Sequence, residues 1–213
     1  MAHLTDTLLL LVLLTNFAVL AASRLTFTIR AAAAQGILLG LLPLAIHHPW
    51  TGHSVVITVG TLAVKGLLLP SFLMWAIREA AVRREVEPSL GPLGSIAAGV
   101  LAIGVSLALS AGLPSIGEGI PPLLVATSFA TMMIGFVVLT TRRKAMTQVV
   151  GYLLLENGVY LFGLAVSARV PFMVEMGVLL DLVVGVFIMG LVVFHMNREL
   201  DSLDSDRLTE LRD

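Results

Sequence analysis

Two acids and one lysine stand out in this sequence because each interrupts a long apolar stretch. They are Glu156, Asp181 and Lys65. A charged side chain at the centre of a bilayer costs about 2.5–3.5 kcal/mol on insertion scales, and such residues are rare unless they have a partner or serve a path for protons or ions. These three residues therefore indicate a route for protons or cations through a membrane.

The two acids lie close to the middle of the helices predicted to contain them. Asp181 is ten residues into its helix, which places it about 15 Å deep at the α-helical rise. Glu156 lies at a similar depth in the preceding helix, and the adjacent Asn157 can donate a hydrogen bond to a carboxylate. A protonated acid that only joins neighbouring helices is the alternative for both. We favour a role in proton movement for both acids.

Lys65 is the counterpart of these acids in the first half of the chain. It lies some 12 residues into its predicted helix, too deep to reach either membrane surface easily. An ion pair with a carboxylate or a neutral amine would make this depth tolerable. The partner carboxylate could belong to this chain or to another subunit, and a structural pair without a transport role is an equal alternative.

Other polar residues lie at the ends of the predicted helices. Glu175 is near the outer end of the last helix, where an interfacial acid is the simpler interpretation and an entry site for protons the alternative. His195 is at the opposite end, where a cation suits the negative end of the helix dipole. We keep both as candidate members of the path. His47, His48 and His53 cluster near one loop, and interfacial packing explains them more simply than a metal site.

The composition is that of an integral membrane protein. Of 213 residues, 57% are hydrophobic and only 13% are charged, and the mean hydropathy is +0.98. A soluble domain has about 25% charged residues. The absence of cysteine excludes disulfides, thiolate-bound zinc and iron–sulfur clusters held by this chain alone. The N-terminus lacks the basic region and cleavage site of a signal peptide, so it is predicted to be the first membrane helix.

Seven segments are long and apolar enough to cross a bilayer, which requires about 20 residues. They cover residues 4–23, 29–47, 53–77, 92–112, 121–141, 146–168 and 171–195. The sequence therefore predicts an all-α bundle of seven transmembrane helices, with a charged tail at 197–213. Asn16, Gln35 and Gln148 are predicted to form hydrogen bonds between helices.

Basic residues predict how the chain is oriented. With seven spans, eleven Lys and Arg residues lie on the side of the C-terminus, and only Arg169 lies on the side of the N-terminus. Cytoplasmic loops carry the excess of Lys and Arg. The C-terminus is therefore predicted to be cytoplasmic and the N-terminus exterior.

A weak internal repeat relates the two halves of the chain. Residues 29–36 resemble residues 142–149, and each segment begins the middle helix of a group of three. A charge follows some 30 residues later, Lys65 in one copy and Asp181 in the other. This pattern predicts a three-helix unit at 1–90, a joining helix at 91–113, a second three-helix unit at 114–196 and a cytoplasmic tail at 197–213.

Motifs for catalysis or cofactor binding are missing from the sequence. It has no phosphate-binding P-loop, no glycine-rich dinucleotide fingerprint and no HExxH zinc motif. Paired histidines at the depth of a membrane-bound haem are also missing. We therefore expect no catalytic centre, no metal site and no cofactor in this chain.

The last three predicted helices resemble the K subunit of respiratory complex I and the C subunit of Mrp-type antiporters. The matching residues are Arg142 and Arg143 at the start of the middle helix, Gly151 and Asn157 within it, Asp181 in the third helix, and the tail at 208–212. The K subunit has a membrane glutamate in each of its last two helices, and Asp181 stands where the second belongs. The first is displaced, because the family position is Leu153 here and Glu156 lies about one helical turn later.

The architecture of the whole chain resembles the hydrogenase-4 component E family, the K-like membrane subunits of formate hydrogenlyase and related group 4 membrane-bound [NiFe]-hydrogenase complexes. This resemblance implies a cofactor-free subunit of an oxidoreductase complex in a bacterial or archaeal cytoplasmic (inner) membrane. Its expected partners are antiporter-like subunits, a membrane anchor and a peripheral hydrogenase arm with iron–sulfur clusters and a NiFe centre, and not nucleic acid. Glu156 and Asp181 would belong to a central hydrophilic axis, which Lys65 would join.

Three functional hypotheses follow. The leading one is a subunit that contributes buried charges to proton translocation in an energy-converting hydrogenase-type complex. The second is a subunit of a multi-subunit Na⁺/H⁺ (Mrp-type) antiporter without a redox arm, and the third is a membrane scaffold whose charges only join helices. The accompanying subunits separate the first two hypotheses, and charge-neutral variants of the acids test the third.

Overall fold

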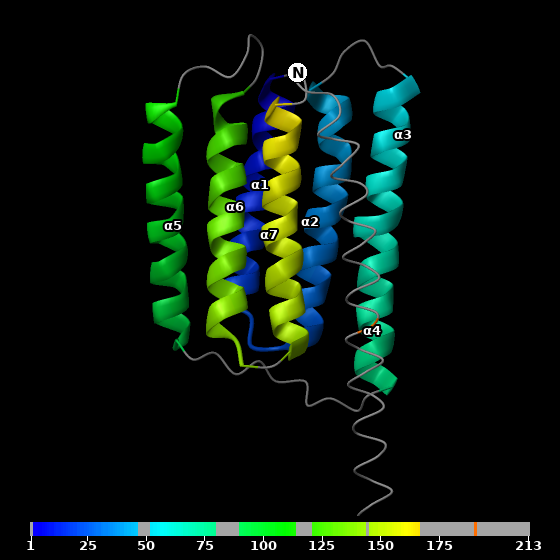
Figure 1. The fold of residues 1–213 in the computed structure, drawn as a ribbon, viewed down its shortest axis with the longest axis vertical. Helices are drawn as coiled ribbons and strands as arrows, with labels where there is room; N and C mark the ends of the chain where they lie inside the picture. Colours follow the sequence, from blue (N-terminus) through cyan, green and yellow to red (C-terminus); the bar gives the residue numbers. More distant parts are fainter. Residues whose placement is uncertain are drawn as a thin grey trace, which may run out of the picture.

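The described part of the protein is a bundle of antiparallel helices (Figure 1). The structure is a computed structural model and describes residues 2–46, 52–79, 90–113, 121–143, 145–166 and 190. The helices are α1 (Ala2–Ala21), α2 (Leu25–Ile46), α3 (Gly52–Thr61), α4 (Leu69–Glu79), α5 (Pro92–Gly112), α6 (Pro122–Thr141) and α7 (Ala145–Val166), and a π-helical segment, η1 (Leu62–Leu68), joins α3 to α4.

Within these residues six helical segments are long and apolar enough to cross a membrane, where α3, η1 and α4 together supply one. The prediction of an all-α multi-pass membrane bundle is confirmed. The predicted seventh span, 171–195, lies outside the described residues.

The largest difference from the predicted spans is at the start of α2. It begins at Leu25 rather than at residue 29, because apolar packing extends the helix past a charged residue. Leu25 and Ile29 are buried, and the Arg24 carbonyl accepts hydrogen bonds from the backbone N–H groups of Phe27 and Thr28, each at 3.1 Å. Arg30 consequently lies inside the helix instead of at its boundary.

Four helices form the centre of the bundle, and two helical segments flank it (Figure 1). The central helices are α1, α2, α6 and α7. On one edge α5 packs against α6 and α1, and on the other edge α3, η1 and α4 pack against α2. Lys65 is in η1, so it approaches the central helices from this second edge.

Small residues allow α6 and α7 to pack with their backbones close together. A Cβ atom added to Gly151 would lie 2.6 Å from the backbone nitrogen of Leu139, and one added to Gly135 would collide with the backbone of Leu155. Glycine at such positions lets membrane helices approach closely. This contact fixes the face that α7 turns toward the other helices, and with it the position of Glu156.

Two apolar layers divide the core along the bundle axis. One layer, near the loop between α1 and α2, includes Leu20, Leu25, Leu73, Val138 and Val150. The other, toward the opposite end, includes Leu9, Leu39, Leu42, Leu124 and Leu161. Along each central helix, buried polar residues lie between residues of one apolar layer and residues of the other. They are Asn16 in α1, Gln35 in α2, Thr131 in α6, and Glu156 and Asn157 in α7. The polar residues thus form one layer near the middle of the bundle.

Candidate functional site: a buried ion pair beside an amide chain

A wider helical turn places Lys65 against α7. Residues 62–68 are π-helical, and the backbone N–H of Leu69 donates to the carbonyl of Val64, five residues earlier. Pro70 follows directly. A proline has no N–H to donate, and its ring clashes with the carbonyl four residues earlier in an α-helix. The wider π-turn relieves this clash, and turns of this kind are frequent at functional sites.

Close packing against α2 holds the π-helical segment in place. A Cβ atom added to Gly36 would lie 2.5 Å from the carbonyl oxygen of Lys65, and one added to Gly40 would lie 2.7 Å from the side chain of Leu62. Only glycine leaves room for this contact at Gly36, because the atom in the way belongs to the backbone. The glycine at Gly36, with Gly40 one helical turn later, therefore lets η1 pack closely against α2.

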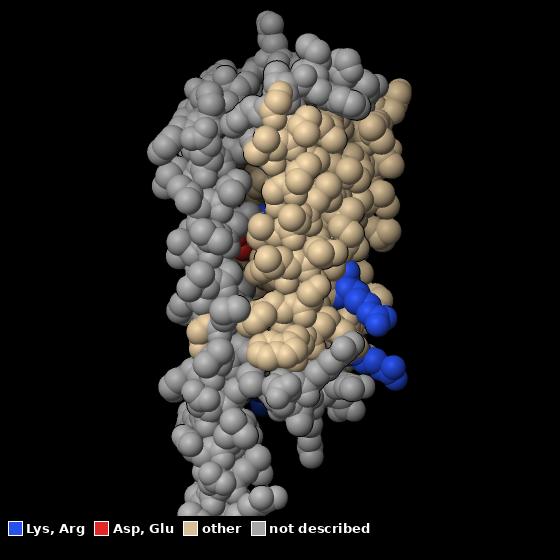
Figure 2. All heavy atoms as spheres, turned by 90° about the vertical axis from the view of Figure 1, so that its right-hand side faces the viewer, with Lys and Arg blue, Asp and Glu red and all other residues tan. Residues whose placement is uncertain are grey.

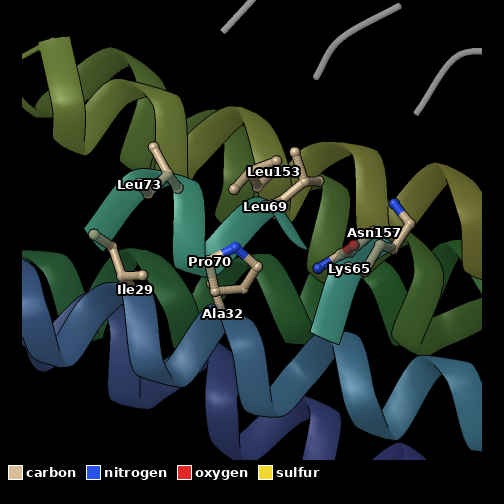
Figure 3. A pocket seen from close by; sticks show the side chains of 8 residues that line it. All are labelled: Ile29, Ala32, Lys65, Leu69, Pro70, Leu73, Leu153 and Asn157. Carbon is tan, nitrogen blue, oxygen red and sulfur yellow. The ribbon is translucent and has the colours of Figure 1, made fainter. Parts of the chain in front are cut away.

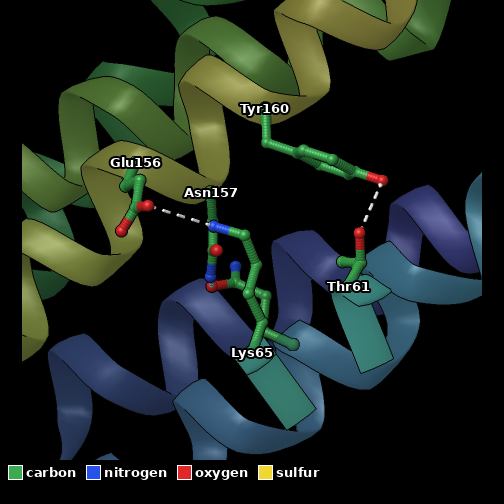
Figure 4. A network of polar contacts seen from close by, with 6 residues as sticks. Thr61, Lys65, Glu156, Asn157 and Tyr160 are labelled. Atoms are coloured by element: carbon green, nitrogen blue, oxygen red, sulfur yellow. Dashed lines mark hydrogen bonds and ion pairs between the residues drawn. The ribbon is translucent and has the colours of Figure 1, made fainter. Parts of the chain in front are cut away.

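Lys65 and Glu156 form a buried ion pair at the centre of the bundle (Figure 4). The Lys65 Nζ and Glu156 Oε1 atoms are 3.5 Å apart, and the two side chains are only 4% and 3% exposed. This distance is longer than a tight hydrogen bond of about 2.7–3.2 Å. Of the alternatives predicted for Lys65, the structure contains the ion pair, and its partner is in this same chain.

Tyr160 and Thr61 extend this site toward the end of the bundle where α3 begins (Figure 4). The Nζ atom of Lys65 lies 5.6 Å from the centre of the Tyr160 ring, within range of a cation–π interaction. Thr61 Oγ1 donates a hydrogen bond of 3.2 Å to the Tyr160 hydroxyl. Thr61 precedes Lys65 by four residues and Tyr160 follows Glu156 by four, so an i, i+4 search around the two charges would have found both.

A chain of amide side chains crosses the bundle in the same polar layer. Asn157 Nδ2 donates to Gln35 Oε1 at 3.0 Å, and Gln35 Nε2 donates to Asn16 Oδ1 at 2.8 Å. Asn16 Nδ2 then donates to Thr131 Oγ1 at 2.9 Å. All four side chains are buried. The chain joins α7, α2, α1 and α6, and the predicted interhelical roles of Asn16 and Gln35 are observed.

Asn157 does not have the partner that its position beside Glu156 suggested. We expected it to donate to a carboxylate, but it donates to Gln35 instead. Successive residues of an α-helix do not face the same way. Glu156 therefore turns toward Lys65, whereas Asn157 turns toward α2, and the two side chains belong to the two different parts of the polar layer.

A small cavity adjoins the ion pair (Figure 3). It has a volume of about 10 Å³, close to the minimum that a single water molecule occupies. It is lined by Lys65, Asn157, Ile29, Ala32, Leu69, Pro70, Leu73 and Leu153. Lys65 and Asn157 bring polar groups to an otherwise apolar wall, so one water could bridge the charged and amide parts of the layer.

Arg142 and Gln148 hold the ends of α1, α6 and α7 together. Arg142 is buried, and its Nη2 atom donates to the Leu20 carbonyl at 2.9 Å. Desolvation by burial lowers the pKa of Arg142, although a guanidinium stays protonated in proteins. Gln148 Nε2 donates to the carbonyl of Arg142, the residue that follows α6, at 3.0 Å, so its hydrogen bond goes to the connection between α6 and α7 and not to another helix as predicted.

The other predicted site residues lie outside the described residues. These are Asp181, Glu175 and His195, and also His47 and His48 of the histidine cluster. Their roles stay predictions. Among the described residues no group of three or more His, Cys, Asp or Glu side chains could hold a metal ion.

Comparison with known proteins relates the second part of the chain to a family of redox-complex subunits. The family model described as NADH-ubiquinone/plastoquinone oxidoreductase chain 4L matches residues 123–213. This range includes α6 and α7, and therefore Glu156 and Asn157.

Longer matches extend into the first part of the chain. The uncharacterized protein Rv0085 of Mycobacterium tuberculosis is 32% identical over 191 residues, which cover 87% of this chain and 85% of that protein. Hydrogenase-4 component E of Escherichia coli strain K12 is 27% identical over 150 residues, which cover 70% of this chain and 68% of that protein. Hydrogenase-4 component E of Shigella flexneri matches to the same extent. No solved structure matches the chain.

The matches and the fold agree with one another. The chain is a multi-pass membrane protein, its match to Rv0085 covers most of both proteins, and its C-terminal part matches chain 4L. The chain therefore belongs to the family that includes Rv0085 and hydrogenase-4 component E, and its own residues 123–213 match the family model of chain 4L.

Proposed function

We propose that this chain is a cofactor-free membrane subunit of an energy-converting hydrogenase-type complex, in which the Lys65–Glu156 pair takes up and releases protons. The observation that carries the proposal is a titratable ion pair, almost fully buried, between two apolar layers in the middle of a membrane bundle. The relatives named hydrogenase-4 component E support the assignment to a hydrogenase-type complex.

The chemistry of the pair suits proton exchange. Transfer of one proton from the Lys65 ammonium to the Glu156 carboxylate converts two charges into two neutral groups. Neutral groups are far less costly in an apolar interior than charged ones. If an outside donor protonates the Glu156 carboxylate instead, the Lys65 ammonium is left as a buried cation without a counter-charge. This state is costly, and it favours the release of a proton from the pair to the next group of the path. The pair thus has several protonation states through which a proton can pass.

The Lys65 and Glu156 side chains lie close enough together for a proton to pass between them. At 3.5 Å the two atoms are within ion-pair range but beyond tight hydrogen-bond distance, and the adjoining cavity has about the volume of one water molecule. A water there would contact Lys65 and Asn157, the two polar residues that line the cavity. In this proposal Asp181, Glu175 and His195 are further members of the path.

The first experiment identifies the complex that contains the chain. Mass spectrometry of the native complex, purified in mild detergent, is expected to detect a [NiFe]-hydrogenase large subunit together with iron–sulfur proteins. Detection of antiporter-like membrane subunits without any redox protein would contradict the hydrogenase assignment and support an Mrp-type Na⁺/H⁺ antiporter instead.

The second experiment tests the ion pair in that complex. In proteoliposomes, complexes that assemble with Glu156→Gln are expected to evolve hydrogen but to translocate far fewer protons per turnover. Asp6→Asn is the matched control, because Asp6 is a partly exposed acid near the start of α1. An unchanged proton ratio in an assembled Glu156→Gln complex would show that the pair is only structural.

A further inference from the structure

A groove separate from the ion pair opens on the surface between α2 and α4. It has a volume of about 340 Å³. It is lined by Arg30 and Ile29 from α2 and by Pro70, Ser71, Met74 and Trp75 from α4. Arg30 and Ser71 thus bring polar groups to a groove whose other lining side chains are largely apolar.

Arg30 is a charged residue without an ionic partner in this part of the molecule. It is exposed, and in the described ranges no carboxylate forms a salt bridge with it. It lies five residues after the start of α2, or about 7.5 Å along the helix at 1.5 Å per residue. Figure 2 shows basic side chains that project from the lower part of the described surface, below a wide uncharged area. An exposed arginine that lines the groove is a donor for an anionic ligand.

We propose that this groove binds an anionic phospholipid, with the lipid phosphate at Arg30 and Ser71 and an acyl chain along the apolar wall. Arg30 offers a planar fork of donors that matches a phosphate, and the Ser71 hydroxyl is a second donor. Trp75 is 47% exposed, and tryptophan is enriched at the level of lipid headgroups. Basic pockets between transmembrane helices bind anionic headgroups elsewhere.

The lining of the groove suits a lipid, because Arg30 and Ser71 bring donors for a phosphate beside apolar side chains that an acyl chain can contact. An acidic side chain on a partner subunit is the alternative anion, and the experiment below distinguishes the two.

The position of the groove gives the lipid a structural consequence. Ile29 and Pro70 line both this groove and the cavity beside Lys65. Two side chains therefore separate the bound lipid from the space next to the ion pair. The lipid would form the outer wall of the polar layer on this edge of the bundle.

Fluorescence quenching of Trp75 tests the proposal directly. The chain has two tryptophans, so Trp50→Phe leaves Trp75 as the only one. The full-length chain is placed in phosphatidylcholine nanodiscs that contain either brominated phosphatidylglycerol or brominated phosphatidylcholine at the same low mole fraction. We expect an apparent affinity roughly fivefold higher for the anionic lipid, the effect of about one basic residue near a membrane surface. Equal quenching by the two lipids would overturn the proposal.

Variants and the assembled complex provide the controls. Arg30→Gln and Ser71→Ala are expected to reduce the preference for phosphatidylglycerol, most strongly in Arg30→Gln. Arg24→Gln is the matched control, since Arg24 is also exposed but does not line the groove, and it should keep the preference. An equal loss in both arginine variants would overturn the site. So would the absence of quenching in the native complex, because a partner subunit would then occupy the groove.

Discussion

The polar layer has two parts that differ in what their chemistry allows. The amide chain from Asn157 through Gln35 and Asn16 to Thr131 consists of neutral groups, each of which donates to the next. The Lys65–Glu156 pair contains titratable groups that are held apart at 3.5 Å. Matched neutral hydrogen bonds hold helices together but cannot store a proton, whereas a loosely spaced ion pair can. Adjacent residues on α7, Glu156 and Asn157, thus serve the two different purposes.

The largest expected effect on stability comes from removing one charge of the pair. Lys65→Met leaves the Glu156 carboxylate without its cation in an apolar interior, which costs about 3–5 kcal/mol. The double variant Lys65→Met/Glu156→Leu should recover most of this loss, because neither charge remains. Chemical unfolding in detergent micelles measures the coupling energy. Simple addition of the two single effects would show that the groups do not interact.

The sequence predicted which residues belong to the polar layer better than it predicted which of them contact one another. Hydropathy identified the spans, and Lys65, Glu156, Asn16 and Gln35 stand out as polar residues at membrane depth. The partner of each residue could not be predicted, because it depends on which faces of α2, α7 and η1 meet. The π-helical turn was also missed, although Pro70 and the small residue Gly66 were its signal.

The next largest effect is expected where α2 meets the π-helical segment. Gly36→Ala places a Cβ atom against the Lys65 backbone, and such overpacking costs about 1–3 kcal/mol. The displaced segment should also widen the Lys65–Glu156 gap and reduce proton translocation by the complex. Gly60→Ala is the control, because nothing lies within 4 Å of the added Cβ atom at that glycine. Equal unfolding free energies for the two variants would contradict close packing at Gly36.

A smaller effect is expected from breaking the amide chain. Gln35→Leu removes two side-chain hydrogen bonds, each of which is worth about 0.6 kcal/mol between membrane helices. The variant should therefore unfold slightly more easily, and the number of protons translocated per turnover should stay the same. This result would sharpen the contrast between the two parts of the layer. A loss of translocation as large as that in Glu156→Gln would erase the contrast.

The smallest effect is expected at the edge of the ion pair. Tyr160→Phe removes the hydroxyl that accepts a hydrogen bond from Thr61 but keeps the ring near Lys65. We expect a loss of about 0.6 kcal/mol in unfolding free energy, typical of one hydrogen bond in a membrane protein. Tyr160→Leu removes the ring as well and should cost more. If the two variants were equally stable, the cation–π contact would contribute nothing measurable.

Infrared difference spectroscopy of the working complex tests the central claim most directly. Proton exchange at Glu156 predicts that a protonated-carboxyl band appears or disappears when the complex turns over, shifts in heavy water and is missing in Glu156→Gln. The same band should persist in Gln35→Leu, because the amide chain only holds the helices. If the difference spectrum of Glu156→Gln were the same as that of the natural protein, Glu156 would not change its protonation state during turnover, and the Lys65–Glu156 pair would be a structural contact only.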